Sequence, residues 1–251
     1  MTKKNLTQYI YSIADNALIL GQRLSELCGH GPTLETDIAM TNIALDLFGQ
    51  TRSYYQYLAN LSTEGLSEDD VAFLRKEHEY RNILLVEQPN NDFAYIITRQ
   101  YLFDVFHYML LEQLQHSKDV NLKAIAHKSI KEVSYHKRFS GDWLKRLGDG
   151  TEISNQKAQE AVNDLWRFTD EMFYLSDDDL ATIESGHGVD TRFFKSKYFE
   201  TVSQLIEEAN LEVPESKYFI DGGKQGIHSE HMGYILAEMQ YMQRTYPDMK
   251  W

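Results

Sequence analysis

The stretch FAYIITRQYLFDVFHYMLL, residues 93–111, decides the fold class of this 251-residue chain. It contains no proline, and its apolar and aromatic side chains recur three and four positions apart, the spacing of one face of an α-helix. That face carries Phe93, Ile97, Tyr101, Asp104, Tyr108 and Leu111. Asp104 is the one carboxylate on it, and a charge buried there needs polar partners. The stretch predicts a long helix with a polar group inside a helical bundle.

The same spacing continues on both sides of this stretch. A proline inside a helix costs about 3 kcal/mol, and none occurs between Pro89 and Pro214, so long helices are permitted. Apolar spacing predicts helices at about 5–28, 33–61, 67–87, 91–117, 119–147, 152–175, 192–210 and 224–245. The acidic segment SDDDLATIESGHG (176–188) is predicted to be a surface loop with one short turn, and VPESKYFIDGG (213–223) to be extended.

These predicted helices define an all-α protein. Four long helices in the first 150 residues indicate a four-helix bundle with additional C-terminal helices. We expect a single domain over 1–251, with the bundle core at about 5–148 and the extra helices at about 152–246. The helices contain Gly21, Gly49, Gly141 and Gly233, and each costs up to about 1 kcal/mol relative to alanine. We expect a neighbouring helix to approach closely at each of them.

Composition excludes several classes of function. The chain has 38 acidic and 25 basic side chains and a net charge of −13, which disfavours binding to nucleic acid and to membrane surfaces. Its single cysteine, Cys28, rules out an internal disulfide and a cysteine-only metal site. No secretory signal is visible, and no apolar run approaches the roughly 20 residues of a membrane helix, so we expect a cytoplasmic protein.

Two helices of the predicted bundle carry candidate metal ligands. A di-iron bundle takes one glutamate from each of two helices and a Glu-x-x-His pair from each of the other two. Asp104 and His107 form an Asp-x-x-His pair. Glu132 and His136 lie four apart on the next helix, both predicted to face inward, and Val133 occupies the position where a glutamate would complete the pair.

The first two predicted helices carry fewer candidate metal ligands. Asp46 lies on the second helix, and the position three residues after it, where a histidine is expected, is Gly49. The first helix has no central inward glutamate, so the predicted site lacks a clear fourth carboxylate. The sequence leaves three interpretations open: a metal-free network of Asp46, Asp104, Glu132 and His136, a di-metal site of Asp104, His107, Glu132 and His136, or unrelated structural roles.

GIHSEH (226–231) is interpreted as helix capping and interface contacts.

Several long blocks resemble a known family. They are ADNALILGQRLSELCGHGPTLETDIAMTNIALDLFGQTR (14–52), LLVEQPNNDFA (84–94), LLEQLQH (110–116), KEVSYH (131–136), RLGDGTE (146–152), LWRFTDEMF (165–173) and GIHSEHMGYILAEMQYMQRTYPDMKW (226–251). In this order they are similar to the C subunits of phenylacetyl-CoA ring-1,2-epoxidase, a multicomponent monooxygenase of aerobic phenylacetate catabolism.

The resemblance implies a ferritin-like structural subunit without catalytic residues or cofactor of its own. It further implies a homologous catalytic A subunit that carries the di-iron site, a small B subunit, and a flavin and iron–sulfur reductase. Asp46, Asp104, Glu132 and His136 would then be vestigial di-metal positions. Two alternatives stay open from the residues: a self-sufficient di-metal oxidase, and a helical interaction module unrelated to oxygen chemistry. The sequence also leaves a homodimer open.

Overall fold

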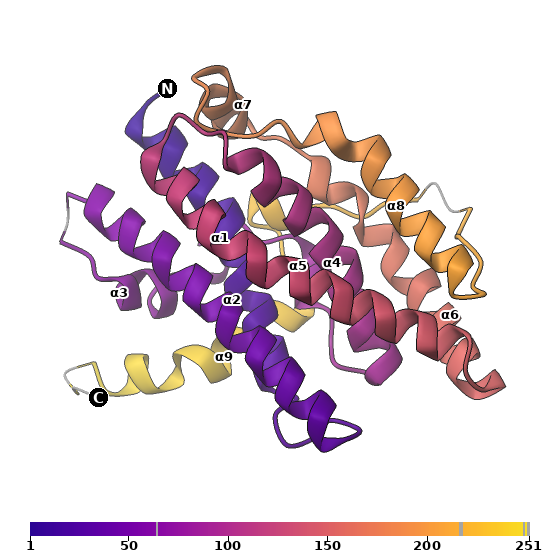
Figure 1. The fold of residues 1–251 in the computed structure, drawn as a ribbon. Coiled ribbons are helices and arrows are strands. Elements are labelled where there is room, and N and C mark those ends of the chain that lie inside the picture. The colour runs from indigo at the N-terminus through magenta and orange to yellow at the C-terminus, as the bar shows by residue number, and fades with distance from the viewer. Residues whose placement is uncertain (64, 216–217, 248, 250–251) are drawn as a thin grey trace. The chain divides into compact units, whose positions relative to one another are not determined.

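The protein is built from helices (Figure 1). The computed structural model describes residues 1–63, 65–215, 218–247 and 249, and these residues contain no strand. In chain order the α-helices are α1 (Lys3–Ser25), α2 (Leu34–Leu61), α3 (Glu68–Phe73), α4 (Phe93–Leu114), α5 (Val120–Gly148), α6 (Glu152–Leu165), α7 (Asp177–Glu184), α8 (Lys195–Glu208) and α9 (Glu230–Thr245). Short 3-10 turns lie at Glu77–Glu79, Leu84–Glu87, Trp166–Phe168, Asp170–Phe173, Thr191–Phe194 and Gly223–Gln225.

The chain divides into two compact units. The first comprises Met1–Pro89, Ser176–Thr182 and Gly222–Trp251, and the second comprises Asn90–Leu175 and Ile183–Asp221. Each unit contains one long helical hairpin, α1 with α2 in the first and α4 with α5 in the second. The predicted all-α, ferritin-like fold class is confirmed, and the single-domain organisation stays a prediction.

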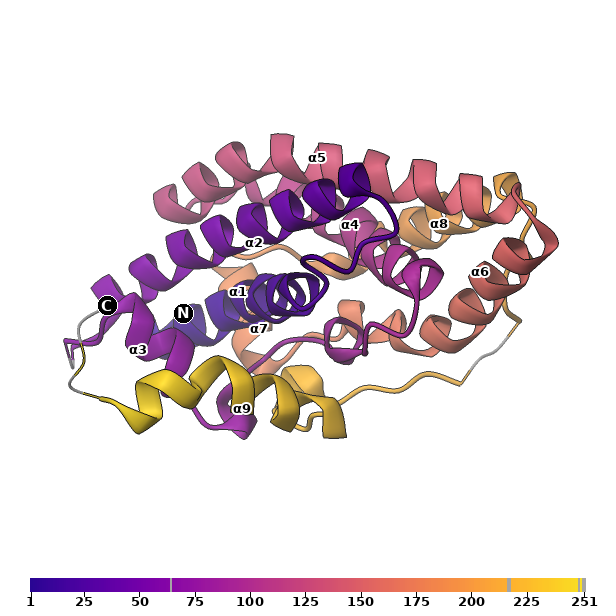
Figure 2. The same cartoon turned by 90° about the horizontal axis from the view of Figure 1, so that it is seen from below.

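The first unit is organised around the α1–α2 hairpin. The side chains of Thr2 and Thr33 accept hydrogen bonds from backbone amides in the first turns of α1 and α2, so both helices begin at capped residues. The buried face of α1 carries Ile10, Ile13, Ala17, Leu20 and Leu24. α3 packs on α2, and α9 packs on α1 and α3; Figure 2 shows α9 running beside α3.

The second unit is organised around α4. Of its 22 residues 18 are buried, because α5, α6 and α8 all pack against it. A helix that is apolar on nearly all sides is typical of such a central position. Asp92 and Asp119 cap the N-termini of α4 and α5 through their carboxylates, which fixes where each helix begins.

The helix predicted at 67–87 is wrong in its second half. α3 ends at Phe73, and the chain continues through 3-10 turns. The reason is tertiary: the backbone amide of Arg81 donates to the carboxylate of Asp15 at 2.8 Å, and that of Ile83 donates to the side-chain oxygen of Asn16 at 2.8 Å. These side chains of α1 satisfy amides that would otherwise have bonded within a helix.

Other boundaries also differ from the prediction. The helix predicted at 152–175 ends at Leu165 and continues as 3-10 turns. The last helix begins at Glu230, not at 224, because Gly222 and Gly226 adopt φ values of +140° and +83°, which a regular helix cannot contain. The segment predicted as a loop at 176–188 contains α7. In the predicted extended segment 213–223, residues 216–217 lie outside the described residues.

The helical glycines divide into two classes. A Cβ on Gly21 would lie 3.0 Å from the ring of Phe48, and one on Gly141 would lie 3.0 Å from Leu205, so both are points of close approach, as predicted. For Gly49 the prediction is wrong among the described residues, because an added Cβ would meet nothing within 4 Å. Gly233 is nearly as open, with one carboxylate oxygen of Glu77 at 3.6 Å.

Replacing Gly148 with alanine is expected to destabilise the second unit by about 1–3 kcal/mol, because its Cβ would overlap the backbone oxygen of Ala209 at the junction of α5 and α8. Urea denaturation followed by circular dichroism measures the change. The control is Gly233→Ala, which meets only a distant side chain and gains helix propensity. Equal stability of the two variants would contradict the close packing at Gly148.

Candidate functional site

The strongest candidate site surrounds Asp104 in the second unit. Asp104 is fully buried on α4, one turn after Gln100. The Gln100 side-chain nitrogen donates to one carboxylate oxygen at 2.7 Å, and the Ser140 hydroxyl donates from α5 to the other at 2.8 Å. Both oxygens therefore have a donor from the chain itself.

Burial controls the protonation of this carboxyl. Desolvation raises the pKa of Asp104 to about 7, although the charge of His136 and the hydrogen bonds from Ser140 and Gln100 act in the opposite direction. A carboxyl with this pKa is poised between its neutral and its charged form near neutral pH. Such a group can hold or release a proton inside the helical core.

Two buried histidines lie close to Asp104. His107 is buried on α4 and His136 on α5. Burial lowers the pKa of His107 to about 3, and the charge of His136 lowers it further, so His107 is a neutral imidazole at physiological pH. Among the described residues the Nδ1 atom of His107 has no hydrogen-bond partner, and the ring of Phe103 lies 5.0 Å from the imidazole ring.

The predicted pair on α5 is buried to different degrees. His136 and Val133 are fully buried, and Glu132 is half-buried beside them. That Glu132 serves as a polar partner inside the bundle stays a prediction. Asp46 lies on α2 in the first unit and is half-buried. Gly49, at the position where a histidine was expected, is exposed.

The donors present do not fit a di-metal centre. Across the described part of the chain, no three histidine, cysteine, aspartate or glutamate side chains converge to hold a metal ion. Valine and glycine cannot ligate iron, and the oxygens of Asp104 already accept hydrogen bonds. Iron and manganese need several anionic ligands to offset their charge. What the arrangement offers is a buried proton-binding carboxyl beside two imidazoles.

Asp104→Asn is expected to change how stability depends on pH. The folded pKa of about 7 lies above the ordinary value near 3.9, so the folded state binds the extra proton, and stability falls as pH rises between these values. Asparagine does not titrate, so the stability of the variant does not fall with pH in this way. Its free energy of unfolding relative to wild type should therefore rise by up to about 1.4 kcal/mol per pH unit.

Urea denaturation at pH 5, 6, 7 and 8 measures this difference. The control is Asp142→Asn, at an exposed position on α5, where we expect no such trend. A difference between Asp104→Asn and wild type that does not vary with pH would contradict the raised pKa of Asp104.

Comparison with known proteins agrees with the resemblance drawn from the sequence blocks. The family described as phenylacetic acid catabolic protein matches residues 1–251. The chain belongs to this family. It is also 50% identical over 246 residues to the C subunit of 1,2-phenylacetyl-CoA epoxidase of Escherichia coli (strain K12), covering 98% of this chain and 99% of that relative.

Among the described residues, this member of the family has no helix long and apolar enough to cross a membrane. The finding agrees with the sequence, in which no apolar run approached that length.

Sequence reasoning missed a buried carboxylate in the first unit. Asp15 on α1 is fully buried, so a central inward carboxylate does exist on the first helix. Its two oxygens accept hydrogen bonds from Arg75 at 2.6 and 2.9 Å, and the Tyr55 hydroxyl of α2 donates at 2.5 Å. The apolar spacing gave no signal for it, because Asp15 lies two positions from both Ile13 and Ala17, and two positions correspond to about 200° around a helix.

A second buried network fixes the start of α9. The carboxylate of Glu87 accepts hydrogen bonds from the His228 Nδ1 atom at 2.6 Å, from the Asn82 side chain at 2.8 Å, and from the amide and hydroxyl of Ser229 at 2.9 and 2.6 Å. Ser229 is the residue immediately before α9. The interpretation of GIHSEH as interface contacts agrees with this arrangement, whereas the Ser229 side chain makes no capping hydrogen bond to α9.

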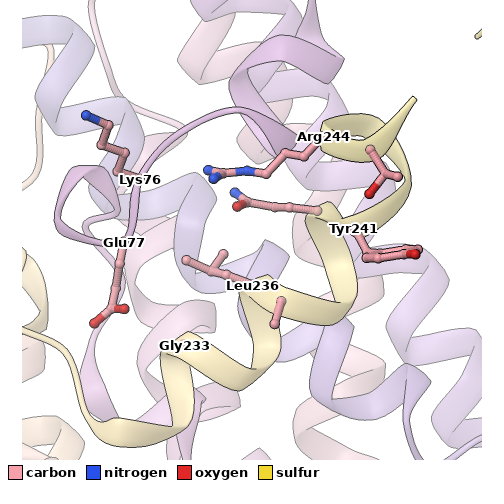
Figure 3. A pocket seen from close by; sticks show the side chains of 9 residues that line it. Lys76, Glu77, Gly233, Leu236, Tyr241 and Arg244 are labelled. Carbon is pink, nitrogen blue, oxygen red and sulfur yellow. The ribbon is translucent and has the colours of Figure 1, made fainter. Parts of the chain in front are cut away.

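A groove of about 400 Å3 lies between α9 and the residues where the first 3-10 turn begins (Figure 3). Leu236, Tyr241 and Arg244 line it from α9, and Lys76 and Glu77 line it from the other side. The guanidinium of Arg244 donates to the backbone oxygen of Arg75 at 3.0 Å. The groove shares no residue with the cluster at Asp104.

Proposed function

We propose that this chain is the non-catalytic, structural subunit of a phenylacetyl-CoA 1,2-epoxidase of aerobic phenylacetate catabolism. In this role it pairs with a homologous A subunit, which holds the di-iron centre, and supports it. A small B subunit and a flavin and iron–sulfur reductase would complete the system, and the cytoplasm would be its location. The family membership and the relative named as a C subunit support the assignment to this system.

One observation supports the proposal that this chain is structural and the A subunit catalytic. The two buried carboxylates that a metal site would use are already bound by the chain's own donors, Asp15 by Arg75 and Asp104 by Gln100 and Ser140. A bidentate guanidinium on Asp15 supplies the positive charge that a metal ion would otherwise supply. The oxygens of both carboxylates are therefore hydrogen-bonded within the chain itself.

Co-expression with the A subunit tests the proposal. Size-exclusion chromatography is expected to give one complex that contains both chains, with epoxidase activity present only when the A subunit is included. Two separately migrating species would defeat the proposal. Loss of phenylacetate-dependent growth after deletion of the gene is also expected; normal growth would favour an interaction module unrelated to this pathway.

The competing function is a self-sufficient di-metal oxidase. The closeness of Asp104, His107 and His136 in one unit is the observation that favours it. Metal analysis of chain purified without chelator separates the two functions. About two iron or manganese ions per chain, lost on Asp104→Ala, would support the oxidase. We expect no such stoichiometry and no effect of the variant on metal content.

A further inference from the structure

The groove beside α9 is formed by one face of that helix and by Lys76 and Glu77, all within the first unit. The residues that α9 contributes on this face recur three and four positions apart, so they share one side of the helix: Gly233, Leu236, Ala237, Gln240 and Arg244. We call this space the α9 groove. Its volume of about 400 Å3 lies within the range of small-molecule pockets, roughly 300–1,000 Å3.

Two basic side chains line the α9 groove without an acidic partner. Among the described residues Lys76 and Arg244 form no ion pair, although the chain has 38 acidic and 25 basic side chains. The guanidinium of Arg244 makes one hydrogen bond, to the backbone oxygen of Arg75 at 3.0 Å, which leaves most of its N–H groups free to donate. Two cations that line one groove repel each other, and an anion bound between them removes this repulsion.

The wall that carries Arg244 is fixed by buried hydrogen bonds. The side-chain nitrogen of Gln240 donates to the same backbone oxygen of Arg75 at 2.8 Å and to the Tyr80 hydroxyl at 2.9 Å. Gln240 and Tyr80 are both buried, so these bonds hold α9 against the segment that contains Tyr80. Figure 3 shows the guanidinium of Arg244 pointing from α9 across the groove towards the segment that carries Lys76. A site that is already ordered loses little affinity to ordering its own side chains.

The rest of the α9 groove has an apolar wall and an acidic end. Leu236 is 6% exposed, and Gly233 and Ala237 beside it carry no long side chain, so this wall is flat. A flat apolar wall suits the face of an aromatic ring. The carboxylate of Glu77 lies close to Gly233, which is eleven residues and about 16 Å along α9 from Arg244. Because like charges repel, Glu77 disfavours a second negative charge on a ligand.

We propose that the α9 groove binds a small aromatic monocarboxylate. Its carboxylate lies between Lys76 and Arg244, its ring lies on Leu236, and Glu77 selects against ligands with a second acidic group. The inference goes beyond the proposed function, because it gives this chain a ligand site of its own. Its failure would leave the pairing with an A subunit untouched.

Titration of the full chain followed by fluorine NMR tests the site. The probe is 4-fluorobenzoate, and we expect a dissociation constant of about 1 mM or tighter, as suits a small ligand in an open groove. Arg244→Gln and Lys76→Gln should each raise this constant at least about fivefold, because each removes a charged hydrogen-bond donor. The matched control is Arg138→Gln, which removes the same charge from an exposed position on α5 and should change the constant by less than about twofold. Circular dichroism checks that all three variants fold.

Competition against the same probe tests the selectivity. Benzoate should displace it, whereas benzyl alcohol, which lacks the charge, and terephthalate, which has a second carboxylate, should each require at least about fivefold higher concentrations. Glu77→Gln should reduce the difference for terephthalate and leave that for benzyl alcohol unchanged. The proposal would be overturned if the probe does not bind, or if Arg138→Gln weakens binding as much as Arg244→Gln. Displacement by benzyl alcohol or inorganic phosphate at the same concentration as benzoate would overturn it as well.

Discussion

Replacing Asp15 with asparagine should lower the free energy of unfolding by about 3–5 kcal/mol, the largest single effect we expect in the first unit. Asp15 and Arg75 form a buried ion pair with two hydrogen bonds, and Tyr55 and the amide of Arg81 donate to the same carboxylate. Asparagine removes the charge and leaves a buried guanidinium without its counter-ion. The loss therefore exceeds that of an exposed ion pair, which contributes about 0–1 kcal/mol.

Urea denaturation at neutral pH measures this loss. The control is Asp142→Asn, an exposed aspartate whose replacement should change stability by less than about 0.5 kcal/mol. A double variant, Asp15→Leu with Arg75→Met, should recover part of the loss, because it removes both buried charges together. Recovery will be incomplete, since Tyr55 and the amide of Arg81 lose their acceptor. If Asp15→Asn behaves like the control, the network does not anchor the segment around Arg81 to α1.

Glu87→Gln should destabilise the first unit by about 3 kcal/mol at pH 6, because it removes the counter-ion of a buried imidazolium and the main acceptor at the start of α9. Burial by itself would lower the pKa of His228, but the hydrogen bond and charge of Glu87 outweigh it, so this pKa is raised above its ordinary value. The second ring nitrogen of His228 lies 3.3 Å from the backbone oxygen of Tyr80, so the protonated ring has two acceptors.

The raised pKa of His228 fixes the sign of the pH dependence. Its stabilising contribution is fully present below the unfolded value of about 6.5 and is lost as pH rises through the raised folded value. The gap between wild type and Glu87→Gln should therefore be larger at pH 6 than at pH 9. Urea denaturation at both pH values measures it, with Glu238→Gln on the exposed side of α9 as control. An equal gap at both pH values would show that His228 is neutral in the folded protein.

The four long helices were predictable because their signals are local. Apolar spacing and capping residues such as Thr33 and Asp92 determine where a helix begins, and they act within one turn. The segment after α3 was not predictable in this way. Its amides bond to Asp15 and Asn16, more than 60 residues earlier in the chain, and no local pattern records such a partner.

The candidate site, like the fold, was predictable from the sequence only in part. Asp104 and His136 stood out because each is a polar residue on an apolar helical face, and both are fully buried. Glu132 and His136 lie four positions apart, so the sequence does not fix the rotation of the helix to better than part of a turn, and the structure buries Val133 fully and Glu132 in part. Asp15 was not predictable because it lies two positions from Ile13 and Ala17, off the apolar stripe of the first helix, and its partner Arg75 lies 60 positions away.

The burial of α4 has a consequence for how such a chain can diverge over evolutionary time. With 18 of its 22 residues buried, almost every replacement in this helix alters packing against α5, α6 or α8. Tolerated changes there must arrive as compensating pairs on two helices, so relatives should vary along α4 in a correlated manner. Exposed positions elsewhere are free to drift one at a time.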